Sequence, residues 1–286
     1  MLFALGLLVV VGSVLGGYLP HGALAVLWQP LELLIILGSA LGAFMIANPA
    51  SVQLGVLKNL KVLARAAPYP KAAYLELLTL LFTMFKLARS KGLLALESHL
   101  EEPYTSELFG AFPHFIANHH AVEFLCDYWR LITLGAENPQ QIEELMTADL
   151  ETHHAEMEQI AGSVTTISDG LPAFGIVAAV LGIIVTMGSI ADPPEVLGSH
   201  VAAALAGTFM GVLLAYGIVA PAGAKLKAYF AAEAKYHECI KAGLLAFLQG
   251  YAPVISVEFA RKALYSNERP SFTTLEEAVA NAPALG

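Results

Sequence analysis

The stretch DGLPAFGIVAAVLGIIVTMGSI at residues 169–190, together with VAAALAGTFMGVLLAYGIVAPAGA at 201–224, decides the class of this protein. Apart from Asp169, neither stretch contains an acidic residue, Lys, Arg or His. Each reaches the roughly 20 apolar residues that a helix needs to cross the hydrocarbon core of a bilayer. The sequence ADPPEVLGSH separates them with prolines and charges. These stretches therefore predict two membrane-spanning helices joined by a short loop.

Two more apolar runs open the chain, one from Leu2 to Leu19 and one from about Leu24 to Ala47. Residues 20–22 form a Pro-His-Gly turn between them, so a helical hairpin is expected. Only 14% of the 286 residues are charged, against roughly 25% in a typical globular protein. The fold class is therefore an all-α membrane protein with four transmembrane helices. No basic residue precedes the first run, which argues against a cleavable signal peptide.

The cations predict the orientation of these helices. Of the 15 Lys and Arg residues, eight lie in 48–168 and seven lie beyond residue 222, and neither short loop has any. Because positive loops stay on the cytoplasmic side, both termini should be cytoplasmic. We expect a transmembrane hairpin at 1–47, a cytoplasmic helical domain at 48–168, transmembrane helices 3 and 4 at 169–224, and a cytoplasmic helical tail at 225–286. A net charge of −9 argues against a nucleic-acid partner.

Helical patterns continue in the cytoplasmic segments. One apolar stripe at three- and four-residue spacings comprises Tyr74, Leu77, Leu78, Leu81, Phe82 and Phe85. A second helix is expected from about Pro113 to Leu134. Cys126 and Cys239 have no close-spaced partner, so we interpret them as reduced thiols.

A third cytoplasmic helix should begin at Asn138, an N-cap residue followed by a first-turn proline, and end near Ile167. A separate helix start is expected at Asp169 and Gly170, which would place Pro172 in a first turn. Beyond the fourth span, residues 225–248 should prolong the same helix into the cytoplasm.

Small residues recur four positions apart in spans three and four. The pairs are Gly175 and Ala179, Ala178 and Gly182, Ala203 and Gly207, Gly207 and Gly211, and Gly211 and Ala215. Such faces let helix backbones approach closely within lipid. Three uses of these faces remain open: packing between helices of this chain, self-association of the chain, and packing against a second membrane protein. Thr186, Thr208 and Tyr216 interrupt the apolar spans, and Pro221 should free a backbone carbonyl and kink the fourth span.

Three stretches, 169–180, 207–217 and 250–262, resemble the flagellar stator subunits of the MotA/TolQ/ExbB superfamily. The resemblance extends over nearly the whole chain, including the opening hairpin and ERPSF at 268–272. It implies a bacterial inner-membrane protein that is not an enzyme and binds no cofactor or metal, with the proton as its coupling ion. It also implies a homopentamer in membrane lipid around the single membrane helices of two MotB chains. By the same resemblance MotB would supply the proton-binding aspartate, which fits the absence of Asp, Glu, Lys, Arg and His from residues 170–190 and 201–224.

The resemblance further implies roles for individual residues. Pro172, Thr208 and Pro221 match positions that line the ion path, and Tyr216 is a further candidate for that path. Ala179 lies where sodium-driven relatives tend to have Thr, and an alanine methyl cannot coordinate Na⁺. The proton is therefore the expected ion, with a sodium-driven stator as an alternative.

Two charges of the 48–168 domain would face the rotor. Arg89 and Glu97 match the family charges that engage the rotor switch protein FliG, although such a charge run is also typical of a solvated helix end. An energiser of the ExbB or TolQ type is the near alternative, but those proteins have three spans and lack the opening hairpin. A membrane enzyme would require acidic or histidine residues in the spans, and a passive scaffold would leave motility unaffected.

Weaker signals remain. The histidine pairs 119–120 and 153–154 offer at most one metal ligand each, because adjacent helical residues point about 100° apart. We therefore interpret them as solvated helix surface. Glu32 follows Gln29-Pro30 in the first turn of span two, where a carboxylate complements the helix dipole. An outer ion-entry role for Glu32 is the alternative.

Overall fold

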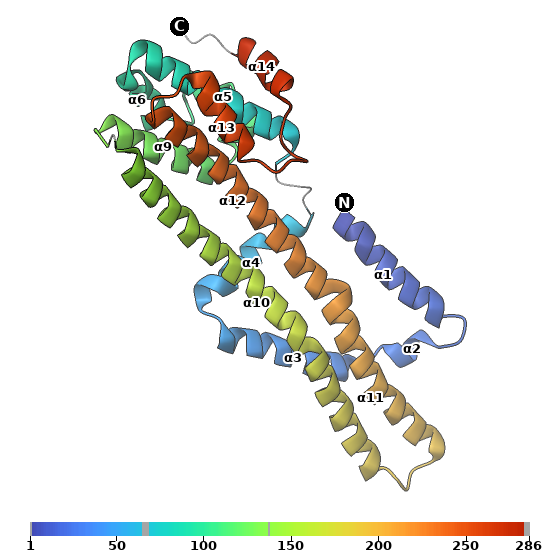
Figure 1. The fold of residues 1–286 in the computed structure, drawn as a ribbon. Coiled ribbons are helices and arrows are strands. Elements are labelled where there is room, and N and C mark those ends of the chain that lie inside the picture. Colours follow the sequence, from blue (N-terminus) through green and yellow to red (C-terminus); the bar gives the residue numbers. More distant parts are fainter. Residues whose placement is uncertain (1, 65–68, 137, 283–286) are drawn as a thin grey trace. The chain divides into compact units, whose positions relative to one another are not determined.

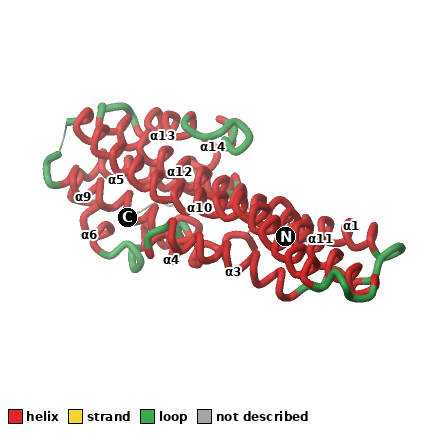
Figure 2. Tube along the Cα trace, turned by 90° about the horizontal axis from the view of Figure 1, so that it is seen from below, coloured by secondary structure: helices red, strands yellow, loops and turns green. Residues whose placement is uncertain are grey.

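The computed structural model describes residues 2–64, 69–136 and 138–282, and all regular structure in these residues is helical (Figures 1 and 2). The chain divides into two compact units. Unit 1 comprises the described parts of 1–66 and 156–229, and unit 2 those of 67–155 and 230–286. The long helices α10 (Pro139–Gly188) and α12 (Ala220–Leu248) contribute residues to both units.

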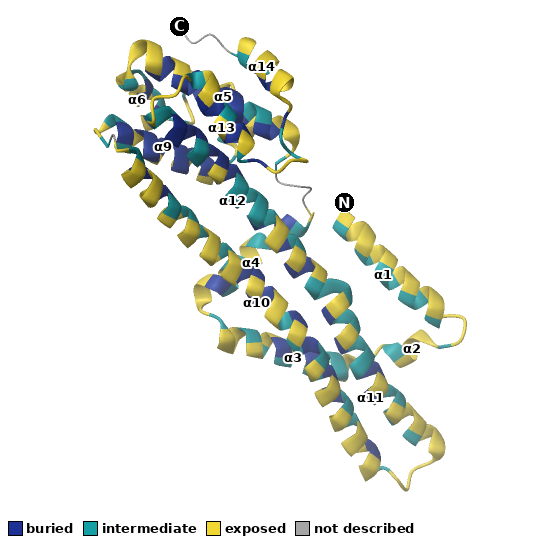
Figure 3. Cartoon of the chain, in the orientation of Figure 1, coloured by how far each residue is buried: buried dark blue, intermediate teal, exposed yellow. Residues whose placement is uncertain are grey.

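Unit 1 carries the apolar helices. They are α1 (Leu2–Tyr18), α2 (Leu24–Leu27), α3 (Pro30–Ala47), the second half of α10 and α11 (Pro194–Leu214), with α4 (Ala50–Asn59) and a short 3₁₀ helix, Leu60–Ala64, following α3. Large apolar side chains are exposed along them, and exposed residues are the yellow parts of the ribbon in Figure 3. Leu8 and Leu34 are each 69% exposed and Val185 is 59% exposed. Such apolar surfaces are typical of helices that face lipid.

Three segments are long and apolar enough to cross a membrane, namely Leu24–Ala47, Pro139–Gly188 and Pro194–Leu248. The described part of α1 has 17 residues and is shorter than these. The predicted apolar run from Leu24 to Ala47 is confirmed as a segment long enough to cross a membrane. It consists of α2 and α3, separated at Trp28 and Gln29. Pro30 explains the break, because a proline is tolerated in a first helical turn and interrupts the backbone ladder elsewhere.

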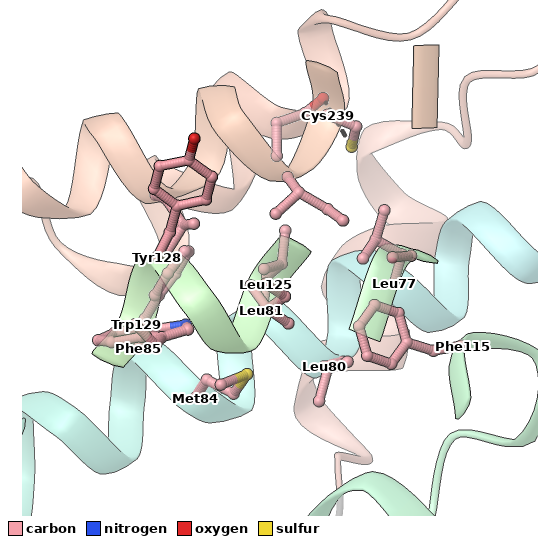
Figure 4. Packing of buried hydrophobic residues seen from close by; sticks show 14 of the residues in the cluster. Leu77, Leu80, Leu81, Met84, Phe85, Phe115, Leu125, Tyr128, Trp129 and Cys239 are labelled. Atoms are coloured by element: carbon pink, nitrogen blue, oxygen red, sulfur yellow. Dashed lines mark hydrogen bonds between the residues drawn. The ribbon is translucent and has the colours of Figure 1, made fainter. Parts of the chain in front are cut away.

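Unit 2 is built on α5 (Lys71–Lys91), which is buried on most of its circumference. All six residues of the predicted stripe are buried, and Leu77, Leu81 and Phe85 pack in the core of Figure 4 with Phe115, Leu125 and Trp129. The surrounding elements are a 3₁₀ helix (Leu93–Leu96), α6 (Glu97–Glu101), α7 (Glu107–Gly110), α8 (Pro113–Ile116), α9 (His119–Thr133), α13 (Pro253–Lys262) and α14 (Phe272–Ala280). The predicted apolar stripe is thus confirmed as part of a core-forming helix.

The predicted helix from Pro113 to Leu134 was wrong in its continuity, because it divides into α8 and α9. Asn118 lies between α8 and α9 and is the N-cap residue of α9. Its Oδ1 accepts a hydrogen bond of 3.3 Å from the Ala121 backbone N–H. An N-cap residue has non-helical dihedral angles, so one Asn is enough to separate the two helices.

The N-cap of α10 is confirmed. Asn138 Oδ1 accepts from the backbone N–H of Gln140 at 3.0 Å. The predicted helix end near Ile167 and the separate start at Asp169 were both wrong, because α10 continues through Pro172 to Gly188. Pro172 therefore lies inside a 50-residue helix. Its missing N–H leaves the carbonyl of Ser168, four residues earlier, without its usual helical donor.

The prolonged fourth span is confirmed, since α12 follows α11 after the segment Ala215–Val219 and continues to Leu248. Both cysteines are buried free thiols. Burial raises the pKa of Cys126 to about 12 and also raises that of Cys239, whose thiol donates to the Ala260 carbonyl at 3.2 Å (Figure 4). Because the thiolate is the reactive form, these two cysteines are packing residues.

Candidate functional site

Glycines allow the second half of α10 to cross α11 at close range. A Cβ added to Gly211 would lie 2.8 Å from the Leu171 carbonyl oxygen and 3.0 Å from Gly175 Cα. A Cβ on Gly175 would lie 3.2 Å from the Gly207 carbonyl oxygen. These are backbone atoms that cannot move aside cheaply, so the crossing requires glycine. Part of the small-residue pattern therefore serves packing inside this chain.

Thr208 lies at this crossing, and its Cα is 3.4 Å from the position of a Cβ on Gly175. Its side chain is partly exposed. Thr186 is 2% exposed, and its hydroxyl donates to the Gly182 carbonyl of its own helix at 2.8 Å. Within the described residues, the Thr208 hydroxyl makes no such bond. It is therefore available to water or to another chain.

Pro172 and Pro221 mark two irregular points that a hydrogen bond connects across the helices. The segment Ala215–Val219 between α11 and α12 is π-helical and ends two residues before Pro221, as expected where a proline removes a donor from the helix. The Ser168 hydroxyl is fully buried and donates to the Ala215 carbonyl at 3.0 Å. This bond joins the turn before Pro172 to the π-helical turn before Pro221.

The remaining candidates lie on surfaces that the single chain does not cover. Tyr216 is 61% exposed, Pro221 is exposed, and Pro172 and Ala179 are partly exposed. The crossing brings Thr208 near the Gly175 turn of α10, whereas Tyr216 and Pro221 lie further along, at the π-helical turn. Side chains exposed in a packed helix pair are free to contact a further membrane helix.

Glu32 belongs with these residues, and its contact could not be read from the sequence. It lies in the first turn of α3, as expected for a carboxylate at the positive end of the helix dipole. A Cβ added to Gly207 would lie 3.5 Å from the Glu32 Cγ and 3.3 Å from the Ala178 Cβ. The side chain of one acidic residue of this chain thus packs on the small-residue face beside Thr208. The only sequence signal was an acidic residue within an apolar run.

The two charges predicted to face a rotor lie in unit 2. Arg89 is exposed near the end of α5, and its Nη1 donates to the carbonyls of Gly250 and Tyr251 at 3.1 Å each. It therefore joins the last turn of α5 to the loop between α12 and α13. Glu97 is exposed in the first turn of α6 and, within the described residues, has no ion-pair partner. Gly92 separates the two charges with a φ of 90°, a backbone conformation that favours glycine.

Comparisons with known proteins give consistent matches. The family described as Motility protein A N-terminal matches residues 4–92, and the MotA/TolQ/ExbB proton channel family matches residues 119–238. Motility protein A of Escherichia coli (strain K12) is 46% identical over 280 residues, which cover 98% of this chain and 95% of the relative. The chemotaxis protein LafT of Vibrio parahaemolyticus is 32% identical over 96% of each chain.

The fold is also similar to a solved structure described as that of C. jejuni MotAB. That chain is 23% identical and superposes with a TM-score of 0.78, covering 94% of this chain and 98% of the solved one. The likeness shows that the chain adopts a known fold.

Proposed function

Since this chain belongs to the motility protein A family, and is thus a flagellar stator subunit with a proton channel family domain, we propose that it couples proton flow to torque on the rotor together with MotB. The family is one of stators and channels, not of enzymes. The observation that carries the proposal is the glycine-mediated crossing of α10 and α11, in spans that contain no Asp, Glu, Lys, Arg or His between residues 170 and 190 or 201 and 224. In this proposal a partner carboxylate carries the proton there.

In this proposal a MotB helix places its aspartate against Pro172, Ala179, Thr208, Tyr216 and Pro221. A carboxylate in apolar surroundings favours its neutral form and ionises where water reaches it. The free hydroxyl of Thr208 offers such a polar point. One proton that crosses about 150 mV releases roughly 3.5 kcal/mol, enough to bias a conformational step. Ala179 offers no oxygen to a metal cation, which favours the proton over Na⁺.

The proposed topology has four spans, with α1 as the first. Both termini and the segments 48–168 and 225–286 are cytoplasmic, because all 15 cations lie in those segments. We further propose that five copies surround two MotB helices in the inner membrane. The exposed apolar faces of α1, α3 and α11 support burial against lipid and neighbouring copies. The match to the Motility protein A N-terminal family over residues 4–92 supports a stator over an ExbB or TolQ energiser.

Torque transfer in this proposal uses Arg89 and Glu97 against FliG. Opposite charges eight residues apart on either side of Gly92 suit a partner with complementary charges. Exposed pairs contribute about 0.2–1 kcal/mol each, so several subunits must act together.

Pro172→Ala tests the proposal in a cell that lacks its own stator subunit. We expect normal membrane levels and assembly but lost or strongly impaired swimming, because the substitution restores the donor for the Ser168 carbonyl and straightens the ion path. Pro194→Ala is the matched control, since Pro194 lies in the first turn of α11, where no donor is needed. Full swimming by the Pro172→Ala cells would contradict the proposal.

A further inference from the structure

Three imidazoles from distant parts of the sequence converge in unit 2. His120 comes from α9, His153 from α10 and His237 from α12. The ring centroids of His120 and His153 are 5.8 Å apart, and those of His153 and His237 are 6.0 Å apart. Each adjacent histidine pair in the sequence thus contributes one member. The third member, His237, lies more than 80 residues further along the chain.

The three rings form a path from solvent to the core. His120 is exposed, His153 is half-buried and His237 is only 4% exposed. His237 Nδ1 lies 2.9 Å from the Glu233 carbonyl, and its ring packs edge-on against Phe124 at 5.2 Å. A proton taken up at the surface therefore has imidazoles to occupy at each depth.

Acidic side chains surround the outer part of this path. A cavity of about 190 Å³ is lined by the three histidines together with Phe124, Leu150, Glu123, Asp127 and Asp149. Asp149 also accepts a bond of 3.0 Å from the Tyr128 hydroxyl. Within the described residues, no group of three or more ligating side chains is arranged to hold a metal ion. The chemistry of the cavity therefore suits the proton itself as a ligand.

We propose that His120, His153 and His237 form a proton-binding cluster through which acidification loosens the packing of α9 against α10 and α12. The carboxylates of Glu123, Asp127 and Asp149 line the cavity beside His120 and His153. When His153 is protonated, a proton on His237 is a buried charge beside a second imidazolium, and the two repel each other. This repulsion is relieved when α9 separates from α10 and α12 and water enters. That the surrounding solution is the cytoplasm rests on the proposed function.

The electrostatics of His237 give the sign of the effect. Burial lowers its pKa, and the charge of a protonated His153 lowers it further, whereas the carbonyl and carboxylate of Glu233 and the backbone of His120 oppose that shift. The unfolded chain then binds a proton more readily than the folded unit does. Stability is fully present above the ordinary pKa of 6.5 and declines as the pH falls from 6.5 towards the lowered value.

Hydrogen exchange of the full-length chain in detergent, measured at pH 7.5 and pH 5.5 and corrected for intrinsic rates, tests the proposal. We expect protection in residues 119–133 to fall severalfold at pH 5.5, while α3 in unit 1 keeps its protection. His237→Gln and, separately, His153→Gln should reduce the change. His154→Gln is the matched control, because His154 is exposed beside His153 and lies outside the cluster cavity.

Each outcome has one interpretation. Equal acid sensitivity in the wild type and in both cluster variants would overturn the proposal, as would equal loss of the response in His154→Gln. If His237→Gln fails to fold, His153→Gln still tests the proposal, because His153 is only half-buried. These results do not depend on motility, so a failed stator assignment and a failed proton cluster are distinguishable.

Discussion

Gly211 is the residue at which α10 and α11 approach most closely, and it supports a direct test of their packing. In Gly211→Ala, the new methyl would lie 2.8 Å from the Leu171 carbonyl oxygen and force the helices apart. We expect a destabilisation of about 1–3 kcal/mol, typical of overpacking, measured as a lower thermal midpoint in detergent and lower membrane levels.

Gly162→Ala is the control for that variant. Gly162 lies in the same α10, and a Cβ there meets nothing within 4 Å. Since alanine favours a helix over glycine by about 1 kcal/mol, this substitution should be neutral or stabilising. A destabilisation of equal size in both variants would show that the crossing at Gly211 has no special packing.

Glu258 provides a prediction on pH. Arg261 is 7% exposed, and its Nε and Nη2 donate to the two Glu258 oxygens at 2.7 and 2.6 Å. These bonds lower the pKa of Glu258 below its ordinary 4.5, with the positive charge of Arg261 contributing as well. The resulting stability is present above pH 4.5 and is lost as the pH falls through the lowered value.

Glu258→Gln should therefore be less stable than the wild type at pH 7, by about 1–3 kcal/mol for hydrogen bonds to a charged group, and the difference should shrink in strong acid. Denaturant unfolding of the full chain at pH 7 and in a series below pH 4.5 measures both values. The exposed Glu276→Gln in α14 should show no difference at either pH. A Glu258→Gln deficit that stays constant with pH would contradict this interpretation.

At the scale of helices, the π-helical turn Ala215–Val219 and Pro221 act as one unit. An alanine at 221 would supply an N–H to the helix and allow a regular α-helical ladder. We expect Pro221→Ala to insert normally and to abolish or strongly reduce swimming, measured in cells that lack their own stator subunit. Pro253→Ala, in the first turn of α13, should swim normally. Equal swimming by both variants would mean that the irregular turn is dispensable.

The same helices show what local sequence predicts and what it does not. The apolar stripe of α5 and the Asn138 cap were predictable, because periodicity and capping depend on neighbouring residues. Pro172 was misplaced, because Asp-Gly-Leu-Pro has the local form of a helix start. Its place inside α10 accompanies non-local contacts of Leu171 and Gly175 with α11.

The candidate site divides in the same way. The small-residue face and the absence of Asp, Glu, Lys, Arg and His from the inner spans could be read directly. The reach of Glu32 to Gly207 and the meeting of His120, His153 and His237 could not be read, because these contacts join residues from separate helices. Only the tertiary packing brings such residues together.

At the scale of the whole molecule, Arg89 has one observed role and one proposed role, and they are separable. Its guanidinium donates to the Gly250 and Tyr251 carbonyls, and its charge would meet the rotor. Arg89→Gln keeps hydrogen-bond donors and removes the charge. If the charge transmits torque, Arg89→Gln and Arg89→Glu should both assemble at motors yet lower rotation speed under load, and Glu97→Lys should deepen the loss. Normal torque in Arg89→Gln would assign this residue to these hydrogen bonds alone, and Lys86→Gln is the exposed control on α5.

A proton-transport assay tests whether this chain conducts protons alone or only together with MotB. Because the inner spans offer no side chain that binds and releases a proton, liposomes that contain this chain alone should acidify no faster than empty ones under an imposed gradient. Liposomes with the chain and MotB should acidify faster, and replacing the MotB aspartate by asparagine should abolish the difference. Glu32→Gln in the complex then asks whether the one carboxylate beside Gly207 assists proton entry, with slower uptake expected if it does. Rapid uptake by the chain without MotB would mean that a group of its own, with Glu32 the first to examine, carries the ion.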